Sequence, residues 1–417
     1  MAEILSVIEH TSLPVIAERT PAQQALSSHH AHLLEKLAPN LPSGTFSWGH
    51  HSVRFAQFCG VIQLDDLTLE ILPKIHGKEE QPESCRTALV QMLYAARLMR
   101  THKGAQAGIN TQQHSLLDIF IQHFCHDLHT QIVQGKLRNY IEQEENLSVM
   151  RGRLVIPQHV RHNLVHKERL FCRFDEFSED MLLNQIIRFT LRLLLPWTCS
   201  GKTKKQLTAL LMHFDDISDA PITLQSFSLL KNDRITQRFQ PVLEQCRLFI
   251  AAIKPDVLAG STPLFSLLFD MNRLFETWVA EKLKPWAHQQ GWQLRTQGPR
   301  KYLAMRDDES QQFQLRPDIT FIDDYGIPQM IADAKWKLLN EADRKLGISS
   351  SDMYQLYAYA GRYKVDNLQL IYPAQAGLLH QYNYSLQGSN APKLAVKTVA
   401  VDNIQMLNWS SPQSILT

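Results

Sequence analysis

Two acidic residues and a lysine lie on two apolar segments that a short turn joins. The first segment, Leu315 to Ile322, contains Asp318 directly after a proline, and the second, Met330 to Trp336, contains Asp333 and Lys335. The Asp-Asp-Tyr-Gly turn between them is typical of a hairpin. Side chains alternate along a strand, so Asp333 and Lys335 share a face, and Asp318 can lie opposite them on the neighbouring strand. The sequence therefore predicts two carboxylates and one ammonium group in one place.

Two converging carboxylates form the kind of oxygen site that Mg²⁺ prefers, with water and phosphate oxygens completing its coordination. We expect Asp318 and Asp333 to be metal ligands, with the backbone carbonyl of Ala334 as a further ligand and Mn²⁺ as a possible substitute for Mg²⁺. The metal would polarise a phosphodiester and lower the pKa of a bound water, while Lys335 positions or deprotonates that water or stabilises developing charge. This is the chemistry of a metal-dependent nuclease. Taken alone, the pattern also fits an ordinary exposed strand pair.

Helices and a further strand are predicted around this hairpin. The segment Phe265 to Trp286 has helical periodicity and carries Glu276. A second helix begins near a serine or aspartate cap at residues 350–352 and carries Gln355 and Tyr359, which lie four residues apart on one face. A strand then follows at residues 368–372. The predicted order is helix, hairpin, helix and strand.

This order of elements resembles the core of the PD-(D/E)xK nucleases, in the variant whose helix carries a glutamine and a tyrosine. More closely, the chain resembles the McrC family, the nuclease subunits of McrBC-type modification-dependent restriction systems, over roughly residues 55 to 375. The residues that carry the resemblance are Ile71 to Ile75, Gly152 to Leu154, Phe174 to Asp180 through Asn184-Gln185, Asn272 to Glu276, Leu315 to Ile319, Asp333 to Lys337, and Asp352 to Tyr359.

The resemblance implies roles for residues beyond the hairpin. Glu276 would help to bind the metal or orient water, although a solvated helix acid is the plainer alternative. Gln355 and Tyr359 would support the site or bind DNA phosphates, although aromatic residues on a helix face usually belong to a core. Lys337 fits a simple exposed charge on a strand.

The resemblance also implies a partner, a McrB-like AAA+ GTPase hexamer that recognises modified double-stranded DNA and is stimulated by this chain. Gly201-Lys202-Thr203 is not a phosphate-binding loop, because Pro196 stands where that motif needs a glycine. We therefore expect the nucleotide to bind to the partner. The resemblance places the partner contact in the N-terminal half.

We predict a Mg²⁺-dependent DNA endonuclease subunit of a restriction system of the 5-methylcytosine type, acting with the AAA+ motor. One alternative is a non-cleaving adaptor that only activates the motor. Another is a stand-alone PD-(D/E)xK repair nuclease. Intact Asp318, Asp333 and Lys335 favour cleavage, and the long region before Phe265 argues against a stand-alone nuclease.

Composition sets the limits within which these functions must fit. At 417 residues and 44% hydrophobic, the chain can bury two or three cores, and a net charge of +2 neither supports nor excludes DNA binding. Six cysteines without CxxC spacing and the lack of a leader-like start predict a reducing, cytoplasmic location, and no apolar segment is long enough to span a membrane.

The fold class that we predict is a multidomain α+β protein. Residues 1–45 form an N-terminal extension, and residues 46–150 form a mixed α/β partner-binding domain that begins with a small antiparallel sheet. Residues 151–263 are mainly helical, and residues 264–417 form the α/β PD-(D/E)xK nuclease domain. Three histidines at helical spacing, His123, His126 and His129, fit a polar helix face better than a zinc site.

Overall fold

A computed structural model of the chain shows two compact units. One unit lies within residues 114–258, and the other combines residues 2–113 with residues 259–417. The structure describes residues 3–21, 23–75, 77–99, 115–135, 138–165, 168–230, 233–259, 262–340, 342–375, 378, 381–387 and 391–401.

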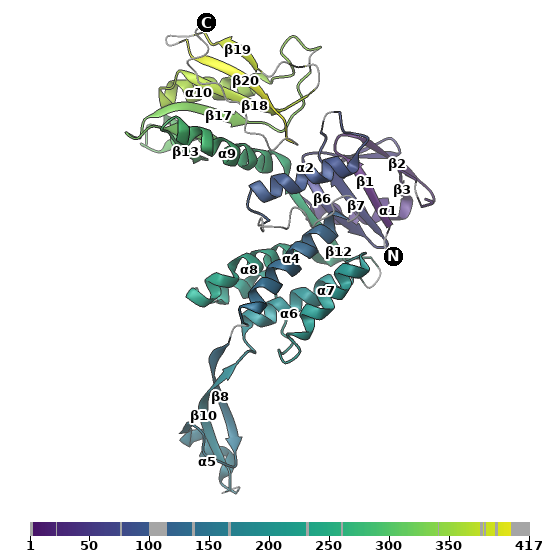
Figure 1. Ribbon diagram of the computed structural model, residues 1–417, viewed down its shortest axis with the longest axis vertical. Helices are drawn as coiled ribbons and strands as arrows, with labels where there is room; N and C mark the ends of the chain where they lie inside the picture. Colours follow the sequence, from purple (N-terminus) through teal and green to yellow (C-terminus); the bar gives the residue numbers. More distant parts are fainter. Residues whose placement is uncertain are drawn as a thin grey trace. The chain divides into compact units, whose positions relative to one another are not determined.

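The N-terminal part of the second unit contains two sheets (Figure 1). In the five-stranded sheet the order is β1-β7-β6-β12-β11, and every residue of β6 and β7 is buried. In the four-stranded sheet the order is β3-β2-β5-β4. The strands are β1 Glu3–Ile8, β2 Ser12–Ile16, β3 Leu26–Ser27, β4 Phe46–Gly49, β5 Ser52–Phe55, β6 Phe58–Leu64, β7 Leu67–Leu72 and β12 Thr262–Asp270, together with β11 Ile253–Ala259, of which residues 253–258 belong to the other unit. The helices are α1 Ser28–Leu37, η1 Ala38–Asn40 and α2 Pro82–Ala95.

The small antiparallel sheet predicted at the start of residues 46–150 is therefore divided, because β4 and β5 belong to the four-stranded sheet and β6 and β7 to the five-stranded sheet. The five-stranded sheet also contains strands from distant parts of the chain. β1 pairs with β7 in parallel, and β12 pairs with β6 in antiparallel fashion. Alternation of residue types identifies each strand locally, but it contains no information about which distant strand becomes its neighbour.

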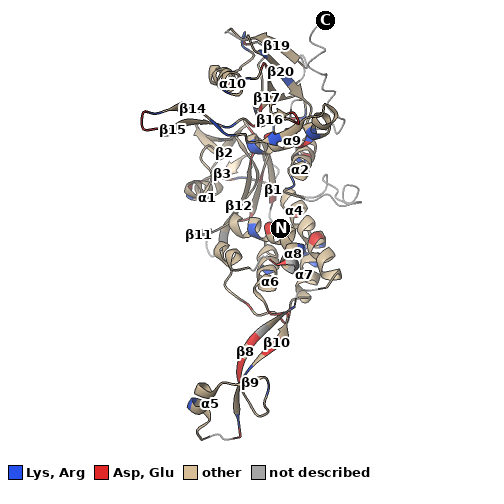
Figure 2. Cartoon of the chain, turned by 90° about the vertical axis from the view of Figure 1, so that its left-hand side faces the viewer, with Lys and Arg blue, Asp and Glu red and all other residues tan. Residues whose placement is uncertain are grey.

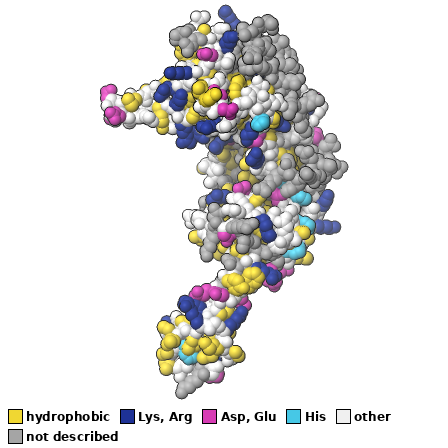
Figure 3. Space-filling model, turned by 60° about the vertical axis from the view of Figure 1, so that its left-hand side comes forward, with side chains coloured by type: hydrophobic (Ala, Val, Ile, Leu, Met, Phe, Trp, Pro, Cys, Tyr) yellow, Lys and Arg dark blue, Asp and Glu magenta, His cyan; other side chains and the backbone are white. Residues whose placement is uncertain are grey.

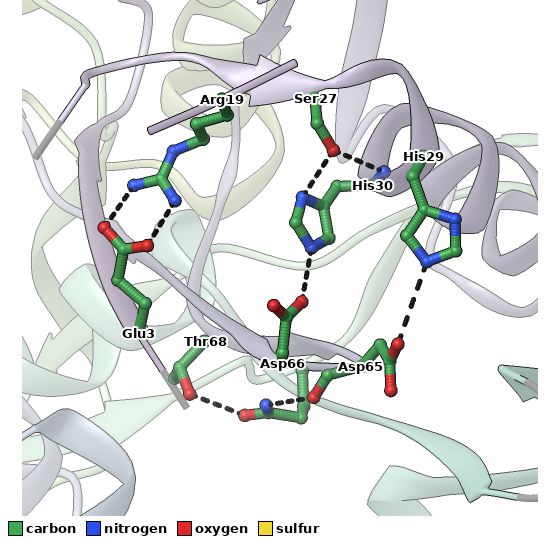
Figure 4. Close-up of polar contacts among 9 residues, drawn as sticks. Glu3, Arg19, Ser27, His29, His30, Asp65, Asp66 and Thr68 are labelled. Atoms are coloured by element: carbon green, nitrogen blue, oxygen red, sulfur yellow. Dashed lines mark hydrogen bonds and ion pairs between the residues drawn. The ribbon is translucent and has the colours of Figure 1, made fainter. Parts of the chain in front are cut away.

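Polar contacts connect Arg19 and His30 to the larger sheet (Figure 4). Arg19 donates two hydrogen bonds to the Glu3 carboxylate, at 2.6 and 2.7 Å. Ser27 caps α1, and the His30 ring on that helix lies 2.8 Å from the Asp66 carboxylate in the turn between β6 and β7. The hydrogen bond from His30 lowers the pKa of Asp66. These residues are thus part of the sheet structure.

The other unit contains a helical group and a three-stranded sheet with the order β8-β10-β9. Residues 151–263, expected to be mainly helical, therefore also contain strands. The helices are α4 Leu116–Val133, α5 Ile156–Asn163, α6 Leu182–Leu194, α7 Gly201–Met212, η2 Leu224–Leu229 and α8 Arg234–Ala252, and the strands are β8 Asn139–Leu147, β9 Arg153–Leu154 and β10 Leu170–Ser178.

The histidines of α4 do not share one environment. His123 is buried, and its Nδ1 lies 3.4 Å from Gln245 on α8 and 3.5 Å from Asp127. His126 and His129 are exposed. The prediction of one polar face was therefore wrong for His123, which forms a buried polar contact between helices.

A six-stranded sheet with the order β13-β16-β17-β18-β20-β19 forms the C-terminal part of the second unit (Figure 1). β17 and β18 are parallel, as are β18 and β20, whereas β16 and β17 are antiparallel. The strands are β13 Gln293–Thr296, β16 Ile319–Ile322, β17 Pro328–Ala334, β18 Asn367–Pro373, β19 Gln381–Ser385 and β20 Lys393–Val399, and β14 Lys301–Met305 pairs separately with β15 Gln311–Leu315.

Two helices, α9 Met271–Gln289 and α10 Ser350–Tyr363, cover opposite faces of this sheet. Trp286 of α9 packs against Phe321 of β16, whereas Tyr359 of α10 belongs to a core cluster with Ile331 of β17. Phe321 is paired with Met330, the residue before Ile331, so the two helices contact opposite sides of the sheet.

The helix predicted from Phe265 begins later, at Met271, because residues 262–270 form β12. Asp270 caps α9 by accepting a hydrogen bond from the backbone N–H of Asn272 at 2.9 Å. A short apolar run cannot be assigned to helix or strand by periodicity alone, which explains the error. The mixed α/β character of the chain is confirmed.

In the part of the chain that the structure describes, no helix has both the length and the apolar composition needed to cross a membrane.

A buried glutamate joins the N-terminal sheet to the C-terminal sheet. Glu9, 1% exposed, follows β1. Its Oε1 accepts hydrogen bonds from the backbone N–H of Lys74 at 2.9 Å and from the Trp336 indole at 2.6 Å. Burial raises the pKa of Glu9 to about 7, although both hydrogen bonds lower it. Trp336 follows directly after the segment of Asp333 and Lys335, so Glu9 helps to position that segment.

We predict that Glu9 makes stability depend on pH. Between pH 4.5 and 7 the folded chain keeps a proton on Glu9 that the unfolded chain has lost, so stability falls as the pH rises through this window. The expected loss is on the order of 3 kcal/mol. Glu9→Gln should remove this pH dependence, whereas Glu18→Gln, at an exposed position, should retain it. Thermal unfolding of both variants from pH 5 to 8 without divalent cations tests this, and equal pH dependence in the two would contradict it.

Candidate functional site

The two aspartates of the hairpin lie side by side at the end of the β16–β17 pair. Asp333 is the penultimate residue of β17 and is 1% exposed. Asp318 directly precedes β16, and the pairing of Ile319 with Ala332 brings it opposite Asp333. Asp318 Oδ2 accepts a hydrogen bond from the Ala334 backbone N–H at 3.1 Å. The structure thus brings both predicted ligands together.

Lys335 pairs with Asp333 across a distance of 2.7 Å between Nζ and Oδ2. Its backbone N–H donates to the carbonyl of Ile371 at 2.9 Å, which continues the pairing of β17 with β18 and holds the lysine in place. Burial alone lowers the pKa of Lys335. The carboxylates of Asp333 and Asp318 raise it by a larger amount, so the net pKa lies above the ordinary lysine value. The lysine is therefore a stable cation in this site.

Glu276 of α9 is the third acid of the site. The side-chain amide of Gln297 donates hydrogen bonds both to Glu276 and, at 3.3 Å, to Asp318 Oδ1. The backbone N–H of Gln297 also donates to the Asp318 carbonyl at 2.8 Å. Burial raises the pKa of Glu276, and the negative charge of Asp333 adds to the effect. Glu276 therefore faces the two aspartates.

Gln297 is a site residue that sequence reasoning missed. It follows β13 and adopts a left-handed backbone conformation with φ of 56°, which costs a non-glycine residue roughly 1–2 kcal/mol. Such strain persists only where the surroundings impose it. Nothing in the local sequence identifies Gln297, because its partners Glu276 and Asp318 each lie 21 residues away.

The three acids are crowded in a poorly solvated position. Burial raises the pKa of Asp318 to about 8, and the negative charges of Asp333 and Glu276 act in the same direction. Carboxylates placed this close resist joint ionisation unless a cation neutralises them. The site therefore contains more acidic groups than the single ammonium group of Lys335 can neutralise.

α10 places Gln355 and Tyr359 near this group, as a hydrogen-bonded pair. Gln355 donates to the Tyr359 hydroxyl at 2.7 Å. Burial raises the pKa of Tyr359, and the negative charges of Asp333 and Asp318 add to this effect, which keeps the phenol neutral. Lys337, predicted to be an exposed strand charge, is half-exposed and lies 3.4 Å from Asp352 of α10.

The residues present fit a divalent cation. Asp333 Oδ1 is buried and has no hydrogen-bond partner, and a buried carboxylate oxygen without a partner is costly unless it binds a cation. Among the described residues no three His, Cys, Asp or Glu side chains are gathered as a ready metal site. A cation would therefore be held by Asp318 and Asp333, with the Ala334 carbonyl and water supplying further oxygens, as proposed from the sequence.

Trp336 and Asn272 support the site from behind. The Trp336 backbone N–H donates to the Asn272 side chain at 3.3 Å, and the Trp336 ring packs edge-on against Phe275 of α9. Since Glu9 holds the indole, the segment after Asp333 is anchored by two separate parts of the chain. The contact of Glu9 was not predicted, because 327 residues separate it from Trp336.

Comparison with known proteins gives a consistent picture. The family described as McrBC 5-methylcytosine restriction system component matches residues 53–373. One similar structure is the refined half-complex from a tetradecameric assembly of Thermococcus gammatolerans McrB AAA+ hexamers with bound McrC, at 19% identity and a TM-score of 0.71, with 95% of this chain and 94% of that chain covered. No curated protein matches the chain.

A second similar structure is the cryo-EM structure of the Thermococcus gammatolerans McrBC complex, at 21% identity and a TM-score of 0.53, with 67% of this chain and 87% of that chain covered. At these identities the two structures establish a shared fold. The family match covers most of the chain and includes Glu276, Asp318, Asp333 and Lys335. The resemblance found in the sequence is thereby confirmed, and the chain belongs to the McrBC 5-methylcytosine restriction system component family.

Proposed function

We propose that this chain is the Mg²⁺-dependent DNA endonuclease subunit of a modification-dependent restriction system. The observation that carries the proposal is the group of three crowded acids beside one lysine, with a buried Asp333 oxygen that has no hydrogen-bond partner. A structural ion pair would need one acid for one lysine. The excess of acidic groups over the single lysine favours a site for a cation, and that cation could in turn bind a phosphate.

The residues of the chain would divide the work. Asp318 and Asp333 would hold Mg²⁺, which supplies polarisation of the phosphodiester and a more acidic bound water. Lys335, kept protonated by its neighbours, is poorly suited to remove a proton and well suited to stabilise charge that develops on the phosphate. Gln297 would fix the orientation of Glu276 and Asp318 through its two hydrogen bonds.

We further propose that the chain works with an AAA+ GTPase, since the similar structures contain McrB AAA+ hexamers with bound McrC. The lobe formed by β8, β9, β10 and α5 offers a surface for this partner (Figure 3). Its exposed apolar side chains are too numerous for an ordinary surface and are typical of an interaction site. They include Val149, Met150, Ile156, Val160, Leu164 and Val165, each more than half exposed.

Replacing Asp333 should abolish cutting without loss of partner activation. We expect Asp333→Asn to lower cleavage of methylated plasmid by at least about a hundredfold, because the site loses one of its two direct cation ligands. The matched control is Asp366→Asn, at an exposed position of the same part of the chain. Cleavage is measured with Mg²⁺, GTP and a McrB-like AAA+ GTPase. If neither the wild type nor any variant cuts DNA, while all of them still stimulate the GTPase of the partner, the chain is an adaptor.

Cation binding should compete with protons. Because the pKa of Asp318 is raised to about 8, Mg²⁺ must displace a proton at neutral pH. Mg²⁺ should therefore raise the thermal unfolding midpoint at any pH. At one fixed Mg²⁺ concentration, we expect this rise to be larger at higher pH. Differential scanning fluorimetry on either side of pH 8 measures this. The response should vanish in Asp318→Asn, and an equal response in that variant would place the cation elsewhere.

The apolar lobe should be needed for partner activation. We expect the double replacement Val160→Ser and Leu164→Ser to weaken GTPase stimulation by at least about tenfold, because each side chain would lose its burial against the partner. Leu229→Ser, at an equally exposed apolar position of the same unit, is the control. Circular dichroism confirms folding. Stimulation that is unchanged in the double variant would exclude this lobe as the partner surface.

A further inference from the structure

A two-stranded ribbon projects beside the candidate site (Figure 2). It consists of β14 and β15, and both of its ends join the site, because Gln297 precedes it and Asp318 follows it. Its root is fastened to α10. Arg362 donates to the Tyr302 carbonyl at 2.7 Å, and the Tyr363 hydroxyl is bonded to the carbonyl groups of Pro299 and Leu315. The ribbon therefore has a fixed direction relative to the acids.

Positive charge gathers at the root of the ribbon. Six basic residues lie there, and within the described residues none of them forms an ion pair. Burial lowers the pKa of one of them, Lys301, and the charges of Arg362 and Lys364 lower it further. Unpaired cations next to a phosphodiester site fit the DNA backbone. The six are Arg295, Arg300, Lys301, Arg316, Arg362 and Lys364.

Farther out, the ribbon exposes apolar side chains. Leu303 and Met305 are two residues apart on β14 and share a face, and both are exposed. Phe313 on β15 is 74% exposed and has a left-handed backbone with φ of 55°. An exposed aromatic residue on strained backbone gains no packing in the free chain, and such outliers cluster at functional sites. These side chains point to a ligand.

The tip of the ribbon carries three exposed acids, Asp307, Asp308 and Glu309 (Figure 2). One exposed arginine, Arg306, lies 4.0 Å from Asp308, so the tip is acidic on balance. Carboxylates repel phosphates, so the tip does not suit the DNA backbone. They do accept hydrogen bonds from cytosine amino groups, which are presented in the major groove together with the thymine methyl groups that favour apolar contacts. Along the ribbon, basic side chains at the root are followed by apolar ones in the middle and acidic ones at the tip. This order matches the chemistry met in passing from the DNA phosphates to the base edges of the major groove.

We propose that this ribbon enters the major groove of the DNA duplex next to the phosphodiester that is cut. This rests on the proposed function. The major groove, about 12 Å wide, admits a two-stranded ribbon, and strands of this length extend about 17 Å, enough to cross it. The basic root contacts phosphates, while Leu303, Met305 and Phe313 contact base edges. The ribbon would thereby hold the duplex in register with Asp318 and Asp333.

The test uses full chains that carry Asp333→Asn, so that DNA is bound and not cut. Duplex binding is measured by fluorescence anisotropy for three proteins. These are the parent, a ribbon variant with Leu303→Ser, Met305→Ser and Phe313→Ser, and a control with Tyr325→Ser and Ile327→Ser. The control residues are equally exposed and lie in the turn at the other end of β16. Each duplex is tested plain, with glucosylated hydroxymethylcytosine filling the major groove, and with netropsin filling the minor groove.

We expect the ribbon variant to bind plain duplex at least about tenfold more weakly than the parent, and the control to bind as the parent does. Glucosylation should weaken the parent by a similar factor and netropsin should not. Equal binding by the ribbon and control variants, or inhibition by netropsin alone, would overturn the ribbon proposal and leave the proposed function intact. Failure of the parent to bind any duplex, together with no cleavage by the wild type, would overturn both.

Discussion

The crowding of three acids around one lysine is the constraint on which the rest of this structure depends. Asp333 is buried, and Asp318 and Glu276 are partly buried. Burial raises the pKa of Asp318 to about 8, and the negative charges of Asp333 and Glu276 act in the same direction. Lys335 offsets one of these charges. Such an arrangement lowers the stability of the folded chain. The surrounding fold must therefore keep the acidic side chains from moving apart. A bound divalent cation would offset the remaining negative charge.

Several segments that are distant in the sequence hold the acidic side chains of the site in position. Gln297, on a strained backbone, ties Glu276 to Asp318. Trp336 is held by Glu9 from the N-terminal sheet and by Asn272 from α9, so the segment that carries Asp333 and Lys335 cannot easily move. The two C-terminal helices then close opposite faces of the sheet. The N-terminal sheet therefore has a direct mechanical role in the site, in addition to any role in binding a partner.

The parts of the site that could be predicted are those encoded locally. Strand alternation and a turn were enough to bring Asp318, Asp333 and Lys335 together, and helical spacing was enough to pair Gln355 with Tyr359. Contacts between distant segments could not be found in this way. Gln297, the hydrogen bond from Trp336 to Glu9 and the parallel pairing of β1 with β7 all depend on the assembled fold. The strand at residues 262–270 was missed because its apolar run fits a helix equally well.

The most direct test of the account is a crystal structure of the chain with Mn²⁺, examined by anomalous diffraction. Mn²⁺ takes the oxygen ligands that Mg²⁺ prefers and marks its own position. We expect an anomalous peak bound by Asp318, Asp333 and the Ala334 carbonyl, and no such peak in the Asp333→Asn variant. An empty site at saturating Mn²⁺, with the acids protonated or paired only to Lys335, would contradict the claim that this cluster is a cation site for DNA cleavage.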